Sequence, residues 1–294
     1  MSSADLAVSL FKELGSGDFR VLQALELGMG QHRFVPLEEV VKYSGLPPSE
    51  VKFRIWNLHK TGLLYSQSGA YVGFVLNTAG YDCLAINALV KGAILEAFGK
   101  SLGVGKEADV YDALTPQGER IAVKFHRIGR TSFRDTRRKR GYEEEQGSAS
   151  WLYRSRLSAE KEFEALRLLH PVGVAVPKPI RQNRHVVVMG LIEGSELAEA
   201  GEVEGAASIL DEVLKNIRLA YQRAGIIHAD LSEYNIILQL DGHVLLIDWP
   251  QYVTREHPNA EDLLERDVAN VLNFFRRKFR VDRSLGEELA KIRS

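Results

Sequence analysis

The chain has almost no cysteine, no long apolar run and almost no net charge. Its single cysteine, Cys83, excludes an internal disulfide and a cysteine-based zinc site, and it suits a reducing compartment. The longest apolar stretches, such as residues 186–192, fall far short of the roughly 20 residues that a bilayer-spanning helix needs. The N-terminus lacks the basic-then-apolar layout of a secretory signal. We therefore expect a cytoplasmic protein without a membrane partner.

The charge balance limits how the chain can bind nucleic acid, and the length indicates how many domains it forms. With 38 basic and 39 acidic residues, any affinity for nucleic acid has to come from local patches. The chain has 294 residues, of which 45% are hydrophobic, and one domain usually takes about 100–200 residues. Two or three folding units are expected. Apolar spacing predicts helices at about 206–223 and 261–279 and a strand at 185–189.

The N-terminal part has the pattern of a winged helix-turn-helix. One short helix begins at Pro36, a second is capped by Ser49, and two short strands, 63–65 and 71–75, follow it. In this fold the third helix usually enters a nucleic-acid groove. The residues placed to reach phosphates there are Lys52, Arg54, His59 and Lys60. A protein-docking or purely structural module is the alternative.

A basic segment without periodicity spans residues 127–150. Its cations are Arg127, Arg130, Arg134, Arg137, Arg138, Lys139 and Arg140. Runs of like charge are commonly solvated, so a flexible surface loop is one interpretation. The other is a flap that gathers phosphate or RNA. Autophosphorylation within this basic loop is a further expectation.

Residues 98–125 change to a strand–turn–strand pattern with glycines in the first turn. Glycines let backbone amides approach phosphate oxygens without an intervening side chain. The candidate phosphate loop is Gly103, Val104, Gly105, Lys106, Glu107, Ala108, Asp109 and Val110. A dinucleotide fold would need a helix after this loop, and a Walker loop would need Gly-Lys-Ser/Thr, so neither fits.

The strand that follows contains Ala122 and Lys124. A lysine on an apolar strand is costly unless its ammonium finds an anion. On a helix over 157–169, Glu162 lies within the apolar stripe, whereas Glu160 and Glu164 face away. Glu162 is therefore the carboxylate expected to pair with Lys124. The alternative is that both side chains reach solvent.

Two carboxylates and a carboxamide mark the ends of strands in the C-terminal part. Asp230 precedes Asn235 by five residues, and Asp248 follows an apolar strand. Magnesium prefers few protein oxygen ligands together with waters and substrate phosphates. Asn235 and Asp248 are therefore the expected metal ligands for Mg²⁺, with Mn²⁺ as a second candidate. Asp230 is left for the nucleophile, and His228 is interpreted as a scaffold for the loop.

The order of these features is that of protein kinases: a glycine loop, a strand lysine, a helix glutamate, His-x-Asp-x-x-x-x-Asn and a strand-end aspartate. ATP is accordingly the expected ligand. Several runs more closely resemble the Rio family of atypical serine/threonine kinases, namely residues 103–111, 122–126, 161–163, 176–179, 228–235 and 247–251. The winged helix in front of them is similar to the second Rio subfamily in its short archaeal form. The resemblance covers essentially the whole chain.

The resemblance implies an α+β fold in which a winged helix-turn-helix precedes a reduced two-lobed kinase-like domain. It implies an ATPase and kinase that binds Mg-ATP, autophosphorylates and acts in small ribosomal subunit maturation, with the subunit precursor and its rRNA as partners. Asp230 would be the catalytic base, Lys124 would contact the α and β phosphates, and Asp248 would also accept phosphate as an aspartyl-phosphate. The adenine hinge would be Met189, Gly190, Leu191 and Ile192.

Departures from ordinary kinases shape the expected activity. Ala108 replaces the third glycine, and Ala229 replaces the arginine that grips a phosphorylated activation loop. No Ala-Pro-Glu follows Asp248, so we expect poor phosphorylation of added proteins. In the subfamily an acidic residue is expected where Gly190 stands. The alternative function is a winged-helix RNA- or ribosome-binding factor in which nucleotide only modulates binding.

Four segments are expected along the chain. They are a winged-helix domain at 1–80, a connecting helix at 81–97, a kinase N-lobe at 98–193 with the basic loop at about 127–150, and a reduced C-lobe at 194–294.

Overall fold

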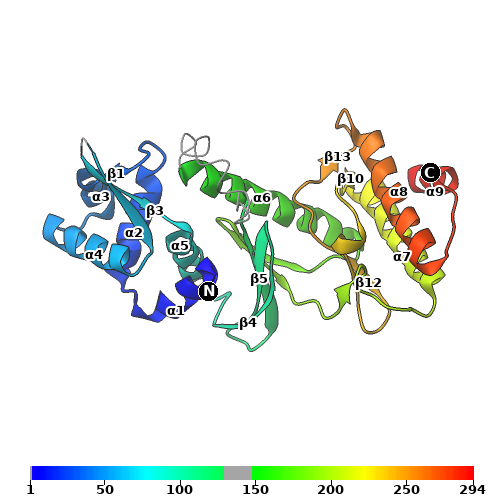
Figure 1. Ribbon diagram of the computed structural model, residues 1–294, viewed down its shortest axis with the longest axis horizontal. Coiled ribbons are helices and arrows are strands. Elements are labelled where there is room, and N and C mark those ends of the chain that lie inside the picture. The colour runs from blue at the N-terminus through cyan, green and yellow to red at the C-terminus, as the bar shows by residue number, and fades with distance from the viewer. Residues whose placement is uncertain (1, 70, 129–147) are drawn as a thin grey trace. The chain divides into compact units, whose positions relative to one another are not determined.

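The computed structural model describes residues 2–69, 71–128 and 148–294 (Figure 1). The chain forms two compact units. Unit 1 comprises Met1–Leu157 and Asn183–Val186, and unit 2 comprises Ser158–Gln182 and Val187–Ser294. Within the described ranges, no helix has the length and apolar character needed to cross a membrane.

Unit 1 begins with a helical cluster and a small antiparallel sheet. Its helices are α1 (Ser3–Leu10), η1 (Phe11–Glu13), α2 (Ser16–Gly28), α3 (Leu37–Ser44), α4 (Pro48–Lys60) and α5 (Thr78–Lys91). Its strands β1 (Val35–Pro36), β2 (Leu64–Ser68) and β3 (Val72–Leu76) lie in the order β1-β3-β2. The chain leaves α3 through Gly45, whose φ of 61° is left-handed and favours glycine. This arrangement confirms the predicted winged helix-turn-helix. Its three helices are α2, α3 and α4, so α4 is the third.

Apolar side chains from the five α-helices form the core of the winged helix. The fully buried ones include Val21, Leu22, Leu25, Val40, Val51, Leu58 and Leu84. Arg54 of α4 departs from its predicted role. Its guanidinium donates to Asp18 at 2.9 Å and to Glu50 at 2.9 and 2.8 Å. Two carboxylates of the same domain therefore already neutralise the charge of Arg54, and a contact of this residue with phosphates stays a prediction.

The rest of unit 1 is built on three antiparallel strands. These are β4 (Ala97–Val104), β5 (Ala108–Leu114) and β6 (Arg120–His126). Tyr111 of β5 ties them to the N-terminus, since its hydroxyl lies 2.6 Å from the Ser2 hydroxyl and donates to Asp5 at 2.9 Å. Residues 129–147, which carry most of the predicted basic loop, lie outside the described residues.

Helix α6 (Ser148–Leu169) begins earlier than the predicted 157–169. Leu152, Ser155 and Ala159 are buried at a spacing of three and four residues, so the buried stripe extends further toward the N-terminus. Ser155 also accepts the backbone N–H of Ile128 at 3.0 Å. The sequence concealed this start because Trp151, Leu152 and Tyr153 are consecutive, so the apolar residues there do not recur at a spacing of three or four.

Unit 2 combines short strands with amphipathic helices. Its strands are β7 (Pro179–Asn183) and β8 (Val186–Gly190), whose adjoining ends Asn183 and Val186 belong to unit 1, together with β9 (Ser195–Glu196), β10 (Ile226–Ile227), β11 (Ile236–Leu238), β12 (Val244–Leu246) and β13 (Val253–Thr254). Its helical segments after α6 are η2 (His170–Val172), α7 (Ala206–Leu219), η3 (Ala220–Ala224), η4 (Glu233–Asn235), α8 (Ala260–Phe279) and α9 (Leu285–Arg293). Strand β7 neighbours β8, β10 pairs with β13, and β9, β11 and β12 form a sheet in the order β12-β11-β9. The loops that join β10 to β11 and follow β12 carry the polar residues singled out from the sequence.

Candidate active site

The candidate phosphate loop is the turn between β4 and β5. Gly105 donates its backbone N–H to the Ala108 carbonyl at 2.8 Å, which closes the turn. The loop is exposed from Gly103 to Glu107. A side chain added at Gly103 would meet no atom within 4 Å. A ligand therefore has open access to the backbone at this end of the turn.

The strand pairing gathers the predicted nucleotide residues of unit 1 on one face. Val110 lies opposite both Gly103 and Lys124. Asp112 lies opposite Ala122. Directly opposed residues of an antiparallel pair point to the same side, and alternate residues of a strand share a face. The shared face therefore carries Gly103, Val110, Ala122 and Lys124. Lys124 is only 9% exposed.

The other face of β5 carries a buried charge network that the sequence did not reveal. Arg127, directly after β6, donates to Asp82 of α5 at 2.6 and 2.9 Å and to Asp109 of β5 at 2.9 Å. The Nε2 atom of His185 lies 2.7 Å from Asp82. All four side chains are buried. Asp109, although part of the candidate loop run, therefore points away from the Lys124 face.

In unit 2, the structure brings Asp230, Asn235 and Asp248 onto neighbouring loops. The Asn235 side-chain amide donates to the Asp230 carbonyl at 2.8 Å, which leaves the amide oxygen of Asn235 as an acceptor. Ile247 donates its backbone N–H to the Asn235 carbonyl at 3.0 Å. Asp248, the next residue, is consequently held beside Asn235. The Asp230 side chain is exposed.

Two residues of these loops have unusual backbone geometry. Ala229 has a φ of 65° and Asp248 a φ of 64°. Non-glycine residues rarely adopt positive φ, and such strain persists where the surroundings enforce it, often at functional sites. The strain sits directly before Asp230 and at Asp248 itself.

Asp267 of α8 enforces the geometry at Ala229, and sequence reasoning missed it. Its carboxylate accepts the backbone N–H of Ala229 at 2.7 Å and of Leu231 at 3.1 Å. Arg266 donates to the Ala229 carbonyl. Burial raises the pKa of Asp267 to about 6, although both backbone N–H bonds act to lower it. The one signal in the sequence was a carboxylate beside the apolar stripe of the predicted helix 261–279.

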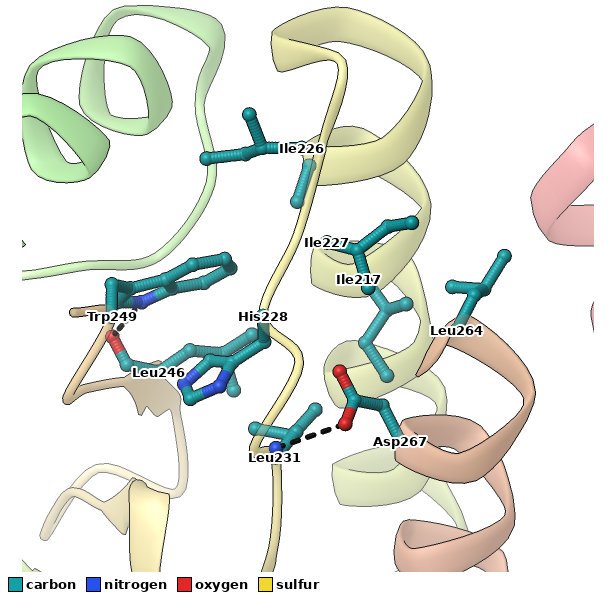
Figure 2. A pocket seen from close by; sticks show the side chains of 10 residues that line it. Ile217, Ile226, Ile227, His228, Leu231, Leu246, Trp249, Leu264 and Asp267 are labelled. Carbon is teal, nitrogen blue, oxygen red and sulfur yellow. Dashed lines mark hydrogen bonds between the residues drawn. The ribbon is translucent and has the colours of Figure 1, made fainter. Parts of the chain in front are cut away.

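His228 connects the loop before Asp230 to the segment before Asp248, in agreement with its predicted role as a scaffold. Its Nε2–H donates to the Ile247 carbonyl at 2.9 Å, and its ring lies 4.4 Å from that of Trp249 between centroids. Figure 2 shows the imidazole beside Trp249 and Leu246, in a small pocket that Asp267 also lines. Burial lowers the pKa of His228. A neutral, buried imidazole suits a structural role better than a base.

The two other predicted groups of unit 2 lie on separate elements. Glu162 of α6 is 2% exposed, so the prediction that it lies in the buried stripe is confirmed. Its pairing with Lys124 remains a prediction. Met189 and Gly190 end β8, and Leu191 and Ile192 follow it without regular structure. The Gly190 N–H donates to the Lys178 carbonyl at 2.9 Å.

The donor set of unit 2 fits a hard cation that takes few protein ligands. Asn235 and Asp248 offer oxygen atoms on adjacent loops, as Mg²⁺ requires. In the described part of the chain, no group of three or more His, Cys, Asp or Glu side chains could hold a metal ion. A cation here would thus depend on waters and substrate phosphates for its remaining ligands.

Comparison with known proteins agrees with this site. The family model "Rio2, N-terminal" matches residues 11–92, and the model "RIO domain" matches residues 109–287. The RIO-type serine/threonine-protein kinase Rio2 of Methanocaldococcus jannaschii is 43% identical over 260 residues, which cover 87% of this chain and 94% of the relative. The serine/threonine-protein kinase RIO2 of Caenorhabditis elegans is 41% identical over 273 residues, 92% of this chain and 51% of the relative.

A solved structure gives the same result. The Rio2 kinase-ADP/Mg²⁺-phosphoaspartate complex from Chaetomium thermophilum superimposes with a TM-score of 0.86 at 32% identity, covering 96% of this chain and 87% of that one. Both the winged helix and the kinase-like part are therefore shared with Rio2 proteins. The chain belongs to the RIO family of serine/threonine protein kinases, in its Rio2 branch.

Proposed function

We propose that this kinase binds Mg-ATP, autophosphorylates and serves as an ATP-driven factor in small ribosomal subunit maturation. The carrying observation is the geometry of two loops. Ala229 and Asp248 both have positive φ, Asp267 accepts the backbone N–H of Ala229, and the Asn235 amide donates to the Asp230 carbonyl. Rigid placement of polar groups is what phosphoryl transfer requires, because catalysis there is mostly positioning and charge stabilisation.

Each part of the nucleotide would be held by residues that the sequence singled out. Lys124, paired with Glu162, would neutralise the α and β phosphates under the turn at 103–107. The hinge, Met189 to Ile192, would bind adenine through backbone groups. Because the Gly190 N–H already donates to the Lys178 carbonyl, we expect the backbone groups of its neighbours to form the hydrogen bonds with adenine.

Asn235 and Asp248 would hold magnesium, which when bound neutralises charge on the β and γ phosphates. For transfer to serine or threonine, Asp230 accepts the hydroxyl proton. For autophosphorylation, a carboxylate oxygen of Asp248 attacks the γ-phosphorus. The bond from that phosphorus to the β–γ bridging oxygen breaks, and ADP leaves with the electron pair. The phosphoaspartate of the C. thermophilum relative supports this second route.

The proposed route is tested by one turnover with γ-labelled ATP, with and without small-subunit precursor particles. We expect a hydroxylamine-labile label on the protein that then appears as free phosphate. Asp248→Ala should abolish the label, whereas Asp241→Ala, which changes an exposed carboxylate of the β11–β12 turn, should keep it. Full labelling of the Asp248→Ala variant would remove Asp248 from the mechanism.

The small ribosomal subunit precursor and its rRNA are the proposed macromolecular partners, and the cytoplasm is the proposed location. Family membership and the single buried thiol, Cys83, support these two assignments. We also retain as proposals the four segments 1–80, 81–97, 98–193 and 194–294. Cosedimentation with precursor particles in ADP, and release in ATP, would test the partner.

A further inference from the structure

The outer face of α4 exposes two large aromatic rings. Val51, Ile55 and Leu58 turn inward and are buried, whereas Phe53 is 63% and Trp56 59% exposed. Removing apolar surface from water stabilises a protein by roughly 25 cal/mol per Å², so leaving large rings exposed gives up this gain. Adjacent exposed aromatic rings are therefore a sign of a contact surface. Tyr65, 62% exposed on the following strand β2, adds a third ring close by in the sequence.

The same face is cationic. Lys52, His59 and Lys60 are exposed on α4, and the Lys60 ammonium lies 5.1 Å from the centroid of the Trp56 ring. The one carboxylate of the helix, Glu50, accepts hydrogen bonds from Arg54. The face formed by Lys52, Phe53, Trp56, His59 and Lys60 thus offers flat rings with positive charge beside them.

This composition suits unpaired bases better than a duplex groove. Base edges in a groove are read mainly by bidentate hydrogen bonds from Arg, Lys, Asn or Gln, and of these side chains on α4 the two lysines are exposed whereas Asn57 is half-buried. Arg54 is unsuited to that task, because Asp18 and Glu50 hold it and its side chain is only 23% exposed. Aromatic rings beside cations are instead the components of single-strand binding, in which bases stack and phosphates meet lysines.

We propose that the outer face of α4 binds single-stranded RNA by stacking unpaired bases on Phe53 and Trp56 while Lys52 and Lys60 contact the flanking phosphates. The charge complementarity of the face selects an anionic partner, and its two rings select one with exposed π faces. The identity of that RNA as rRNA rests on the proposed ribosomal function, whereas the stacking surface itself does not.

The test measures binding of the full chain to a fluorescein-labelled single-stranded RNA 12-mer by anisotropy, beside the same DNA strand and the RNA duplex. Phe53→Ala and Trp56→Ala should each weaken RNA binding about tenfold or more. Trp56→Phe should restore most of the affinity because it keeps a ring. Leu27→Ala is the matched control, since Leu27 is also 63% exposed but lies on α2.

Salt and activity measurements complete the test. Replacing Lys52 and Lys60 by Ala should flatten the salt dependence of binding by about two phosphate contacts. All α4 variants should autophosphorylate as the wild type does, so failure of this inference is distinguishable from failure of the kinase mechanism. Equal binding by Trp56→Ala and Leu27→Ala, preference for the duplex, or loss of only protein contacts with the precursor particle would overturn the proposal.

Discussion

At the scale of single residues, Asp267 shows how the path of the loop that carries Asp230 can depend on one buried side chain of a distant helix. It satisfies two backbone N–H groups around a residue with positive φ, and it is 1% exposed. A buried carboxylate whose donors are both backbone groups fixes the path of the chain more firmly than packing alone. Asp267 is therefore a positioning residue for Asp230.

We predict that Asp267→Asn lowers phosphoryl transfer by an order of magnitude or more and destabilises the protein by about 1–3 kcal/mol. The asparagine oxygen can accept one of the two N–H groups, but its amide then faces the other donor. Single-turnover labelling and urea unfolding measure the two effects. Glu265→Gln, on the exposed side of the same helix, should change neither. Wild-type turnover in Asp267→Asn would show that the loop keeps its path without the carboxylate.

Residue-level prediction from sequence succeeded where the pattern was local. The apolar stripe placed Glu162 in the buried face of its helix, and the structure agrees. The pairing of Arg54 with Asp18 and the role of Asp267 were not predictable, because each depends on residues that are distant in the sequence. A carboxylate beside an apolar stripe looks the same whether it binds backbone donors or solvent.

At the scale of elements, close helix packing explains a glycine inside α5. A Cβ added at Gly80 would lie 2.2 Å from the carbonyl oxygen of Leu63. That oxygen belongs to the backbone at the entry to the hairpin, so it cannot move aside as a flexible side chain would. Helix α5 can thus approach the backbone at Leu63 closely only because residue 80 has no side chain.

We predict that Gly80→Ala destabilises unit 1 by about 1–3 kcal/mol, even though alanine favours an isolated helix. The clash with Leu63 outweighs the gain in helix propensity. Gly69→Ala, where an added Cβ would meet nothing within 4 Å, is the matched control and should be nearly neutral. Urea midpoints decide the comparison, and a stabilised Gly80→Ala variant would contradict it.

Among elements, the sequence predicted type better than extent. The winged helix, the glycine turn and the long C-terminal helix were all expected, because hydrophobic period and turn residues are local signals. The start of α6 was placed too late. Its first turns bury only small or isolated apolar residues, such as Leu152, so the helical period there is weak.

At the scale of the whole molecule, the buried network of Asp82, Asp109, Arg127 and His185 joins the last helix of the winged-helix part to strand β5 of the kinase-like part. Its charges compensate one another inside unit 1. Removing one partner from such a network leaves an unpaired buried charge, which is strongly destabilising. The two parts of unit 1 are therefore expected to unfold together.

We predict that unit 1 loses stability as the pH falls from about 6.5 toward 4. Burial lowers the pKa of His185 to about 4, so below its ordinary value of 6.5 the unfolded chain binds a proton that the folded chain does not. His185 therefore adds about 3 kcal/mol to the free energy of unfolding above pH 6.5, and this stabilisation is lost as the pH falls toward 4. The pKa of Asp82 is lowered too, because Arg127 and His185 outweigh its burial, and this adds a loss below its ordinary range.

Hydrogen exchange at pH 7 and pH 5 measures this effect, with protection in α5 and β6 expected to fall together. His185→Gln can still donate to Asp82 but does not titrate, so it should lose less stability over the same interval. An identical loss in the variant and the wild type would assign the acid sensitivity to other groups.

Strand β5 limits which insertions and deletions this protein can tolerate. Its alternate residues serve two opposite tasks, with Val110 on the Lys124 side and Asp109 against Arg127. Deleting one residue within the strand would shift its frame and exchange the two. A carboxylate would then stand where phosphates are expected, and valine would leave Arg127 without one of its two anions. Single-residue insertions and deletions should therefore be tolerated in the hairpin turn at Gly118 but not between Ala108 and Leu114.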